Sequence, residues 1–251
     1  MARKRTSRAP APLSFRGPPR GIEGLAPLLT AAPAAATLAV DLREADTSAR
    51  IEPLVLQTEP AGAEATWLRF DLPPTTPPGT YSGSVQLGTD RFPITVDVHP
   101  QQELAISPQA LAASASAGDE ATIEFILINE GNVPFEVGRT HAFNLLQREA
   151  IEEAIHAALR AETAKGESRL DRFADELANR HGGLVRVSIA DGAGALAPGE
   201  ARSLRAVLRL PANLTPGSTY TSTWPLGNLN VSVDIQIEPA ARRSRGKQEV
   251  A

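Results

Sequence analysis

The spacing most suited to chemistry in this 251-residue chain is Glu153-x-x-His156. Residues three apart share one face of a helix, and a carboxylate beside an imidazole is an arrangement that di-iron helical bundles use. Further candidate ligands lie nearby, namely Glu149, Glu152, Asp171, Asp175 and His181. Such a site also needs a second Glu-x-x-His motif, which the sequence does not contain. We therefore predict a solvated charged face without a metal ion, and we keep a metal-dependent enzyme as the third interpretation of function.

Other catalytic signatures are also missing from the sequence. It has no Gly-x-Ser-x-Gly elbow, no Gly-Lys-Ser/Thr phosphate loop and no His-Glu-x-x-His motif. It contains no cysteine, which removes disulfides, thiolate metal sites and cysteine nucleophiles together. The prediction is a non-enzymatic protein with no catalytic residues and no cofactor.

The charged residues above belong to a segment with helical periodicity. Apolar residues at i, i+3, i+4, i+7 and i+8 predict two amphipathic helices, over residues 143–164 and 168–180, with the charges on the opposite face. Ser168 and Asp171 resemble a capping arrangement at the start of the second helix. The apolar stripes must pack on a sandwich, on each other or on a partner. We predict that a partner protein contacts Trp67, Ile151, Ile155, Leu159, Phe173 and Leu177.

The rest of the sequence is dominated by period-two alternation and contains a repeat. LPPTTPPGTY (residues 72–81) is followed about 140 residues later by LPANLTPGSTY (residues 210–220). Alternating apolar residues follow each copy, as they do in strands with one buried face. The residues expected to be buried in two separate β cores are Leu72, Phe92, Ile94, Val96, Leu210, Val231, Val233 and Ile235. The alternation places Tyr81, Tyr220 and Trp224 inward and Trp67 outward. Each copy therefore predicts the last strands of a β-sandwich.

These patterns predict a mainly β protein with two tandem sandwiches, the second carrying a helical hairpin. The predicted organisation is an N-terminal arm (1–36), a first sandwich (37–100), a second sandwich (101–239) with helical residues 143–180, and a C-terminal tail (240–251). Residues 1–24 and 240–251 are expected to lack fixed structure because they are rich in Arg and Pro and have no apolar periodicity.

The quoted repeat, together with LINEGNVPFEV (127–137), resembles bacterial immunoglobulin-like β-sandwich modules of surface proteins and glycoside hydrolases. The shared pattern is an Asn-x-Gly turn, a Leu-Pro crossing and a Tyr after Gly. Two copies of this module are implied. The resemblance implies an immunoglobulin-like fold with adhesion, spacer or assembly roles, and fold alone does not choose among these roles.

Both ends of the chain are basic, although the net charge is −4. Candidate residues for electrostatic docking are Arg3, Lys4, Arg5, Arg8, Arg242, Arg243 and Arg245. Such ends suit an anionic surface or an acidic partner. Nucleic-acid binding is not expected, because the ends carry a single aromatic residue and no recognised motif.

The function that the sequence favours is a structural or scaffold protein acting through protein–protein contacts in an assembly. The alternative is a carbohydrate-binding accessory module that uses Trp67 as a stacking platform. The sequence contains no uninterrupted run of about 20 apolar residues, so a membrane span is not predicted. A cytoplasmic location is favoured because no export signal is convincing, with the cell envelope or the exterior as the alternative.

Overall fold

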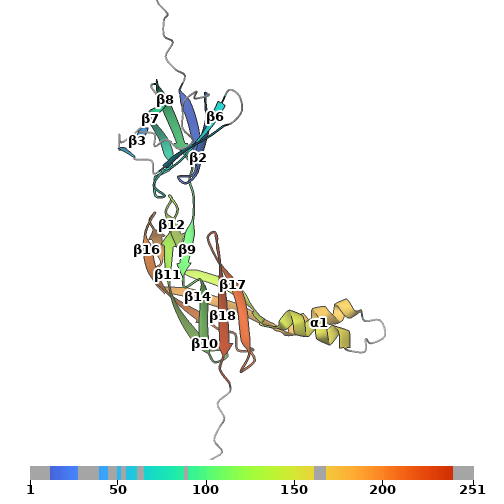
Figure 1. Cartoon of the computed structure of the whole chain (residues 1–251). Helices are drawn as coiled ribbons and strands as arrows, with labels where there is room; N and C mark the ends of the chain where they lie inside the picture. Colours follow the sequence, from blue (N-terminus) through green and yellow to red (C-terminus); the bar gives the residue numbers. More distant parts are fainter. Residues whose placement is uncertain are drawn as a thin grey trace, which may run out of the picture. The chain divides into compact units, whose positions relative to one another are not determined.

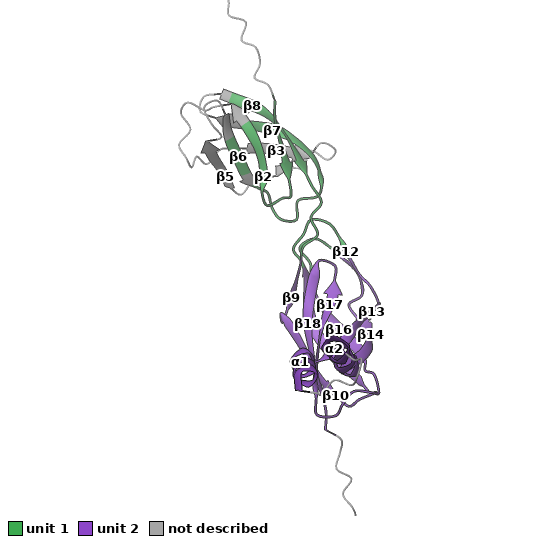
Figure 2. Ribbon diagram, turned by 90° about the vertical axis from the view of Figure 1, so that its right-hand side faces the viewer, with its two compact units in different colours: residues 1–103, 129–135, 197–200 green, residues 104–128, 136–196, 201–251 purple. Residues whose placement is uncertain are grey.

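The computed structural model describes residues 12–27, 40–44, 50–51, 55–60, 65–87, 90–160 and 168–239 (Figure 1). The chain is mainly β, as predicted, and divides into two compact units, which Figure 2 shows in different colours. Unit 1 comprises residues 1–103, 129–135 and 197–200, and unit 2 comprises residues 104–128, 136–196 and 201–251.

Unit 1 contains one hydrogen-bonded sheet with the strand order β4-β3-β7-β8-β1-β2-β6-β5. Its strands are β1 (Leu13–Gly17), β2 (Ile22–Pro27), β3 (Val40–Glu44), β4 (Arg50–Ile51), β5 (Val55–Pro60), β6 (Ala65–Asp71), β7 (Gly79–Leu87) and β8 (Asp90–Val98). Neighbouring strands pair antiparallel, except that β1 runs parallel to β8.

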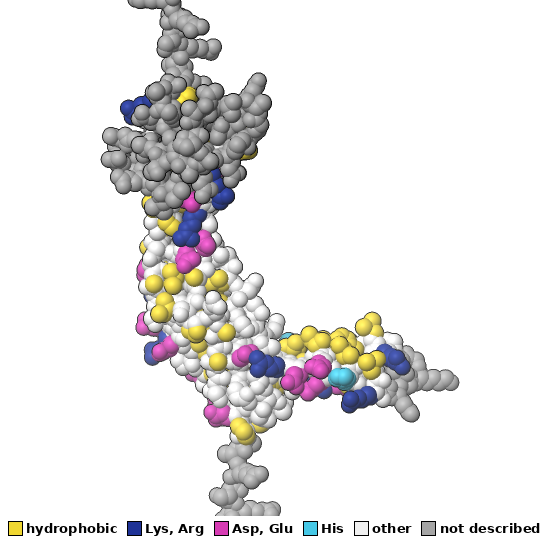
Figure 3. Space-filling model, viewed as in Figure 1, with side chains coloured by type: hydrophobic (Ala, Val, Ile, Leu, Met, Phe, Trp, Pro, Cys, Tyr) yellow, Lys and Arg dark blue, Asp and Glu magenta, His cyan; other side chains and the backbone are white. Residues whose placement is uncertain are grey.

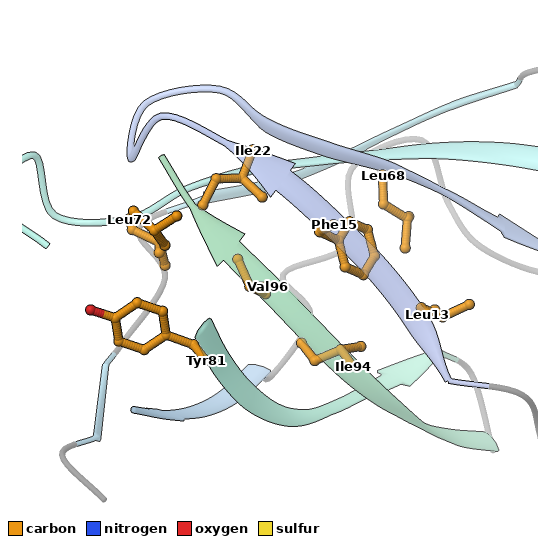
Figure 4. Packing of buried hydrophobic residues seen from close by; sticks show 9 residues of the cluster. Leu13, Phe15, Ile22, Leu68, Leu72, Tyr81, Ile94 and Val96 are labelled. Carbon is orange, nitrogen blue, oxygen red and sulfur yellow. The ribbon is translucent and has the colours of Figure 1, made fainter. Parts of the chain in front are cut away.

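The core of unit 1 forms because alternate residues of its strands point to the same side of the sheet. Figure 4 shows side chains from several strands converging in one cluster. The buried members are Leu13, Phe15, Ile22, Leu68, Leu72, Tyr81, Ile94, Val96 and Val98. Phe92, which the alternation also assigned to this core, is partly buried and packs against the cluster.

The N-terminal arm predicted for residues 1–36 is partly wrong. Residues 13–17 and 22–27 form β1 and β2, so the first sandwich begins well before residue 37. Leu13 and Phe15 alternate with the exposed Ser14 and Arg16, which places the basic side chain outward and the apolar ones in the core. β1 has only five residues, and the sequence around it is rich in Arg and Pro. A run this short does not show a clear alternation of apolar and polar residues.

Unit 2 contains a sheet with the strand order β10-β18-β17-β13-β14-β16-β11-β9, and a small sheet that pairs β12 with β15. Its strands are β9 (Leu104–Ser107), β10 (Ala110–Ala115), β11 (Glu120–Asn129), β12 (Phe135–Val137), β13 (Thr140–Gln147), β14 (His181–Asp191), β15 (Gly194–Leu196), β16 (Ala201–Arg209), β17 (Thr219–Leu226) and β18 (Leu229–Ile237). β14 pairs with both β13 and β16, and β10 runs parallel to β18.

The core of unit 2 is organised around Trp224, which is fully buried. The rings of Phe125, His141 and Phe143 surround it, with centroids 5.4–6.0 Å from its own. The predicted burial of Leu210, Val231, Val233 and Ile235 is confirmed. Burying a single Trp with three ring neighbours fixes how the strands that carry these rings pack together.

The repeated sequence gives both units the same local structure. Tyr81 and Tyr220 are buried, as predicted, and the hydroxyl of each bonds to the backbone of the preceding crossing. The Tyr81 hydroxyl donates to the Pro77 carbonyl oxygen at 2.7 Å, and the Tyr220 hydroxyl accepts from the Thr215 amide at 3.0 Å. Pro77 and Thr215 occupy the same place in the repeat, so the hydroxyl donates where proline offers no N–H group.

Antiparallel strands around an apolar core, closed by an N-terminal strand running parallel to the last one, form an immunoglobulin-like β-sandwich. Leu13 pairs with Ile94 in unit 1, and Leu111 pairs with Val233 in unit 2. The predicted fold class is therefore what the structure shows.

The helical segment is shorter than the predicted span of residues 143–180. The structure has α1 (Ala150–Arg160) and α2 (Arg169–Asn179), whereas helices over 143–164 and 168–180 were predicted. Residues 143–147 belong to β13, where Phe143 and Leu145 are buried and pair with β14. The predicted helix extended from Ile151 back to residue 143. The structure instead buries the alternate side chains Phe143 and Leu145, as a strand does.

Both chain ends contain predicted features outside the described residues. Arg3, Lys4, Arg5 and Arg8 lie there, as does the whole C-terminal tail with Arg242, Arg243 and Arg245. Among the residues that the structure describes, neither helix has the length and apolar character needed to cross a bilayer.

The two tyrosine hydroxyls allow a direct comparison of the units. We expect Tyr81→Phe and Tyr220→Phe each to lower the free energy of unfolding by about 1 kcal/mol, because each removes one hydrogen bond and leaves its backbone partner unpaired. Denaturant unfolding measures this loss. Trp67→Phe is the control, since Trp67 is exposed. Equal stability of the wild type and both tyrosine variants would contradict the assignment.

Candidate interaction surface on the helical hairpin

The hairpin α1–α2 extends from the paired ends of β13 and β14 in unit 2 (Figure 1). The two helices pack mainly on each other. Their base is fixed to the sheet, since the Arg148 side chain lies 3.1 Å from the Asp234 carboxylate on β18 and the Arg148 amide donates to the Thr219 carbonyl oxygen. Gly182 lets the strand pass the ring of Tyr220, because an added Cβ would lie 2.8 Å from that ring.

Three alanines form the buried side of α1. Ala150, Ala154 and Ala158 are almost fully buried and recur every four residues, so they lie on one side of the helix. Their small side chains suit close packing against α2. Because α1 buries alanines, its larger apolar residues are left on another side.

The larger apolar residues form a second row, which we call the aliphatic row. It consists of Ile151, Ile155 and Leu159, whose side chains are 54%, 44% and 58% exposed. Figure 3 shows apolar side chains following one another along the hairpin. The sequence predicts that this stripe packs either on the flank of its own sandwich or on another chain. The exposure shows that the described part of the sandwich does not cover it.

A third row flanks the aliphatic row on the next i, i+4 ridge. It consists of Glu152, His156 and Arg160, all exposed, and we call it the charged row. Oε1 of Glu152 lies 3.8 Å from Nε2 of His156. The charges therefore run from acidic near the strands to basic near the far end, beside the apolar side chains and not opposite to them as predicted (Figure 3).

The second helix supports the first and exposes less of its predicted stripe. Phe173 and Leu177 are half-buried, whereas Leu170 is 73% exposed. Glu153 of α1 forms an ion pair with Arg180, which follows the end of α2. This pair joins the two helices, and no local pattern predicts it because its residues are 27 positions apart.

The start of α2 has the predicted cap. The Ser168 hydroxyl accepts from the Asp171 amide at 3.1 Å, and the Asp171 carboxylate accepts from the Ser168 amide at 3.0 Å. The hydroxyl also donates to that carboxylate at 2.7 Å. The hydroxyl first, and the backbone amide second, lower the pKa of Asp171 because both stabilise its charged form.

A hollow lies at the base of the hairpin, next to the aliphatic row. Its volume is about 510 Å³, and its lining includes Leu146, Ala150, Ile151, Ile155 and Thr221. Apolar atoms dominate this lining. The hollow can therefore accept an apolar side chain but offers little to orient a polar ligand.

The residues of the metal hypothesis do not come together. Glu153 binds Arg180, and His156 lies beside Glu152. Within the described ranges, no three His, Asp or Glu side chains are placed to hold a metal ion together.

Trp67 lies on β6 of unit 1 and is 41% exposed, as its parity predicted. It pairs across the ladder with Leu25 of β2, which is 51% exposed. The two side chains form a small outward apolar pair. Leu25 was not predicted as a surface residue, because its place opposite Trp67 follows only once β2 is recognised.

Comparisons with known proteins give only distant likenesses. Neither a protein-family model nor a curated protein matches the chain. The similar solved structures include the PapD-like domain of human CEP192, which is 12% identical with a TM-score of 0.29 over 57% of this chain and 94% of that one. The DIP-gamma IG1+IG2 structure is 11% identical with a TM-score of 0.32, over 92% and 97% of the two chains.

A three-domain immunoglobulin fragment of titin is 9% identical with a TM-score of 0.38, covering 93% of this chain and 65% of that one. Because these TM-scores are low, the fold assignment rests on the strand order and burial of this chain itself. The function must be argued from the hairpin surface.

The capping box leads to a prediction about α2. We expect Ser168→Ala to speed amide exchange in α2 and to raise the pKa of Asp171 toward its usual value of about 3.9, because both side-chain hydrogen bonds are lost. Because folding lowers the pKa of Asp171, its ionised carboxylate stabilises the fold at pH values above the usual pKa. This contribution is lost as the pH falls through the lowered pKa. NMR titration of Asp171 measures the shift. Ser168→Thr keeps the hydroxyl and should behave like the wild type; an unchanged titration in Ser168→Ala would refute the cap.

Proposed function

We propose that this chain is a non-catalytic scaffold or assembly subunit that acts through protein–protein contacts, with the helical hairpin as its docking element. The observation that carries the proposal is the exposed aliphatic row, Ile151, Ile155 and Leu159. Fully burying an Ile or Leu side chain is worth about 1.5–3 kcal/mol, so covering the row would supply several kcal/mol to an association.

The hairpin is also prepared for docking. Ordering a residue costs about 1–2 kcal/mol of backbone entropy, which here is met before any partner arrives. The Glu153–Arg180 ion pair joins the two helices, the alanine side of α1 is buried, and the Ser168 cap fixes the first turn of α2. A surface already held in its binding conformation loses less free energy on association than one that must first order.

The sandwiches serve in this proposal as rigid supports, in keeping with the bacterial immunoglobulin-like modules that the sequence resembles. The basic residues near both ends would add a salt-sensitive attraction to an anionic surface or an acidic partner. Their contribution is to the rate and orientation of docking more than to its strength.

A carbohydrate-binding role is the second candidate, and the exposed Trp67 favours it. An exposed indole beside Leu25 offers a flat apolar face of the kind that sugar rings stack on. If this role holds, a glycan array should show binding that Trp67→Ala abolishes and that Trp67→Phe largely keeps. An array without binding by the wild type would exclude this candidate.

The docking role is tested by replacing Ile151, Ile155 and Leu159 together with serine. We expect the variant to lose the proteins that co-purify with the wild type from the cells that naturally make it, because the apolar contact is gone. Its melting temperature should change little, since these side chains contribute to neither β core. Quantitative mass spectrometry of the co-purified proteins provides the measurement.

The matched control is Ile126→Ser, which removes one exposed isoleucine (44%) from β11 of the same unit. This control should keep every wild-type partner. Recovery of the same partners in the same amounts with the triple variant, together with an unchanged oligomeric state, would show that the hairpin is not the docking element.

A further inference from the structure

We infer that the occupant of the aliphatic row is a second copy of this chain, with α1 of each copy packed antiparallel on α1 of the other. This inference rests on the proposed docking role of the hairpin and names its partner. It draws on the order of residues along the aliphatic and charged rows and on the hollow at the base.

The aliphatic row has the spacing of a helix-packing ridge. Its residues lie at i, i+4 and i+8, and such ridges pack between the equivalent ridges of a second helix. In an antiparallel pair related by a twofold axis at Ile155, the two Ile155 side chains meet, and Ile151 of each copy meets Leu159 of the other. All six aliphatic side chains are then covered. The contact of Ile151 with Leu159 is made twice, and the contact between the two Ile155 side chains is made once, on the axis.

The charged row makes this arrangement self-complementary. Glu152 and Arg160 lie four residues, about 6 Å, on either side of His156. The twofold axis at Ile155 lies one residue, about 1.5 Å, from this midpoint. It places Glu152 of each copy beside Arg160 of the other, because the same flank of both helices faces the same way. In a parallel pair the twofold axis runs along the helices and places the two charged rows on opposite sides of the contact, where they do not meet. Only the antiparallel pairing gains the attraction between Glu152 and Arg160, so the charges favour it.

The hollow at the base fits the same arrangement. Antiparallel packing brings the far end of one α1, where Leu159 is 58% exposed, over the base of the other. There the apolar lining from Leu146, Ile151 and Thr221 leaves about 510 Å³ of space. Each chain carries both the exposed Leu159 and the hollow, so in a pair of copies the Leu159 end of each one lies over the hollow of the other.

The test uses the full chain and the charged row. Glu152→Arg alone puts two arginines together at each contact, and Arg160→Glu alone puts two glutamates together. We expect each single variant to weaken self-association by about tenfold or more, measured by sedimentation over roughly 1–100 µM. The double variant Glu152→Arg/Arg160→Glu restores opposite charges at both contacts and should dimerise like the wild type.

Mixing the two single variants provides the sharpest comparison. One copy then carries arginine at both positions and the other carries glutamate at both, so each heterodimer has two opposite-charge contacts. We expect heterodimers at wild-type strength from two proteins that barely associate alone. This result also controls for any weakening of α1 by an arginine in its first turn. Failure of the mixture to associate, or single variants that dimerise like the wild type, would overturn the inference.

Ile155→Asp should give a monomer with intact β cores. A wild type that stays monomeric across the concentration range, or a dimer that Ile155→Asp leaves unchanged, overturns the second copy as the occupant. The proposed function fails separately, when the triple serine variant keeps both its self-association and all its co-purified partners. A monomeric wild type whose partners are lost in that variant would show that the hairpin docks a different protein.

Discussion

The burial of three alanines on one side of α1, in a hairpin whose helices contact each other, is the constraint on which the exposed surface depends. Ala150, Ala154 and Ala158 occupy the buried side, so the helices associate without using the larger side chains of α1. If isoleucine and leucine stood there instead, the hairpin would bury its own apolar area and expose little. Small residues inside and large residues outside reverse the usual order of an amphipathic helix, and we propose from this reversal that another molecule covers the surface.

The β-sandwich of unit 2 determines where this surface is presented. β13 and β14 pair along most of their length and then continue into the two helices. The Arg148–Asp234 ion pair and the backbone bond from Arg148 to Thr219 hold the start of α1 against β17 and β18. The hairpin is therefore attached to the sheet at its base, while its aliphatic row stays exposed. The buried Trp224 and its ring neighbours supply the rigidity of that support.

Sequence patterns predicted the fold wherever a strand was long enough to show its period. Val231, Val233, Ile235 and Ile237 alternate over nearly the whole of β18, and all four are buried. β1 was missed because its burial involves a run of only five residues, and its partner β8 lies about 80 positions further on in the chain. Pairings between distant strands are decided by tertiary contacts that no local window contains.

The candidate site was predicted in part for the same physical reason. Helical spacing found Ile151, Ile155 and Leu159, but it treated them as one stripe with Ala154 and Ala158. Which of two adjacent ridges faces α2 depends on how closely the helices approach, and the alanines decide that. The charged row was visible as the i, i+4 series Glu152, His156 and Arg160. A role for the charged row in pairing could be proposed only once the structure showed that the adjacent aliphatic row is exposed.

We propose that another protein chain covers the aliphatic row in the cell, and site-specific photocrosslinking tests this proposal most directly. A photoreactive amino acid replaces Ile155 in one variant and Ala174, an exposed residue of α2, in another. We expect position 155 to crosslink to a protein chain in living cells and position 174 not to do so. Equal crosslinking at the two positions, or none at position 155, would contradict it.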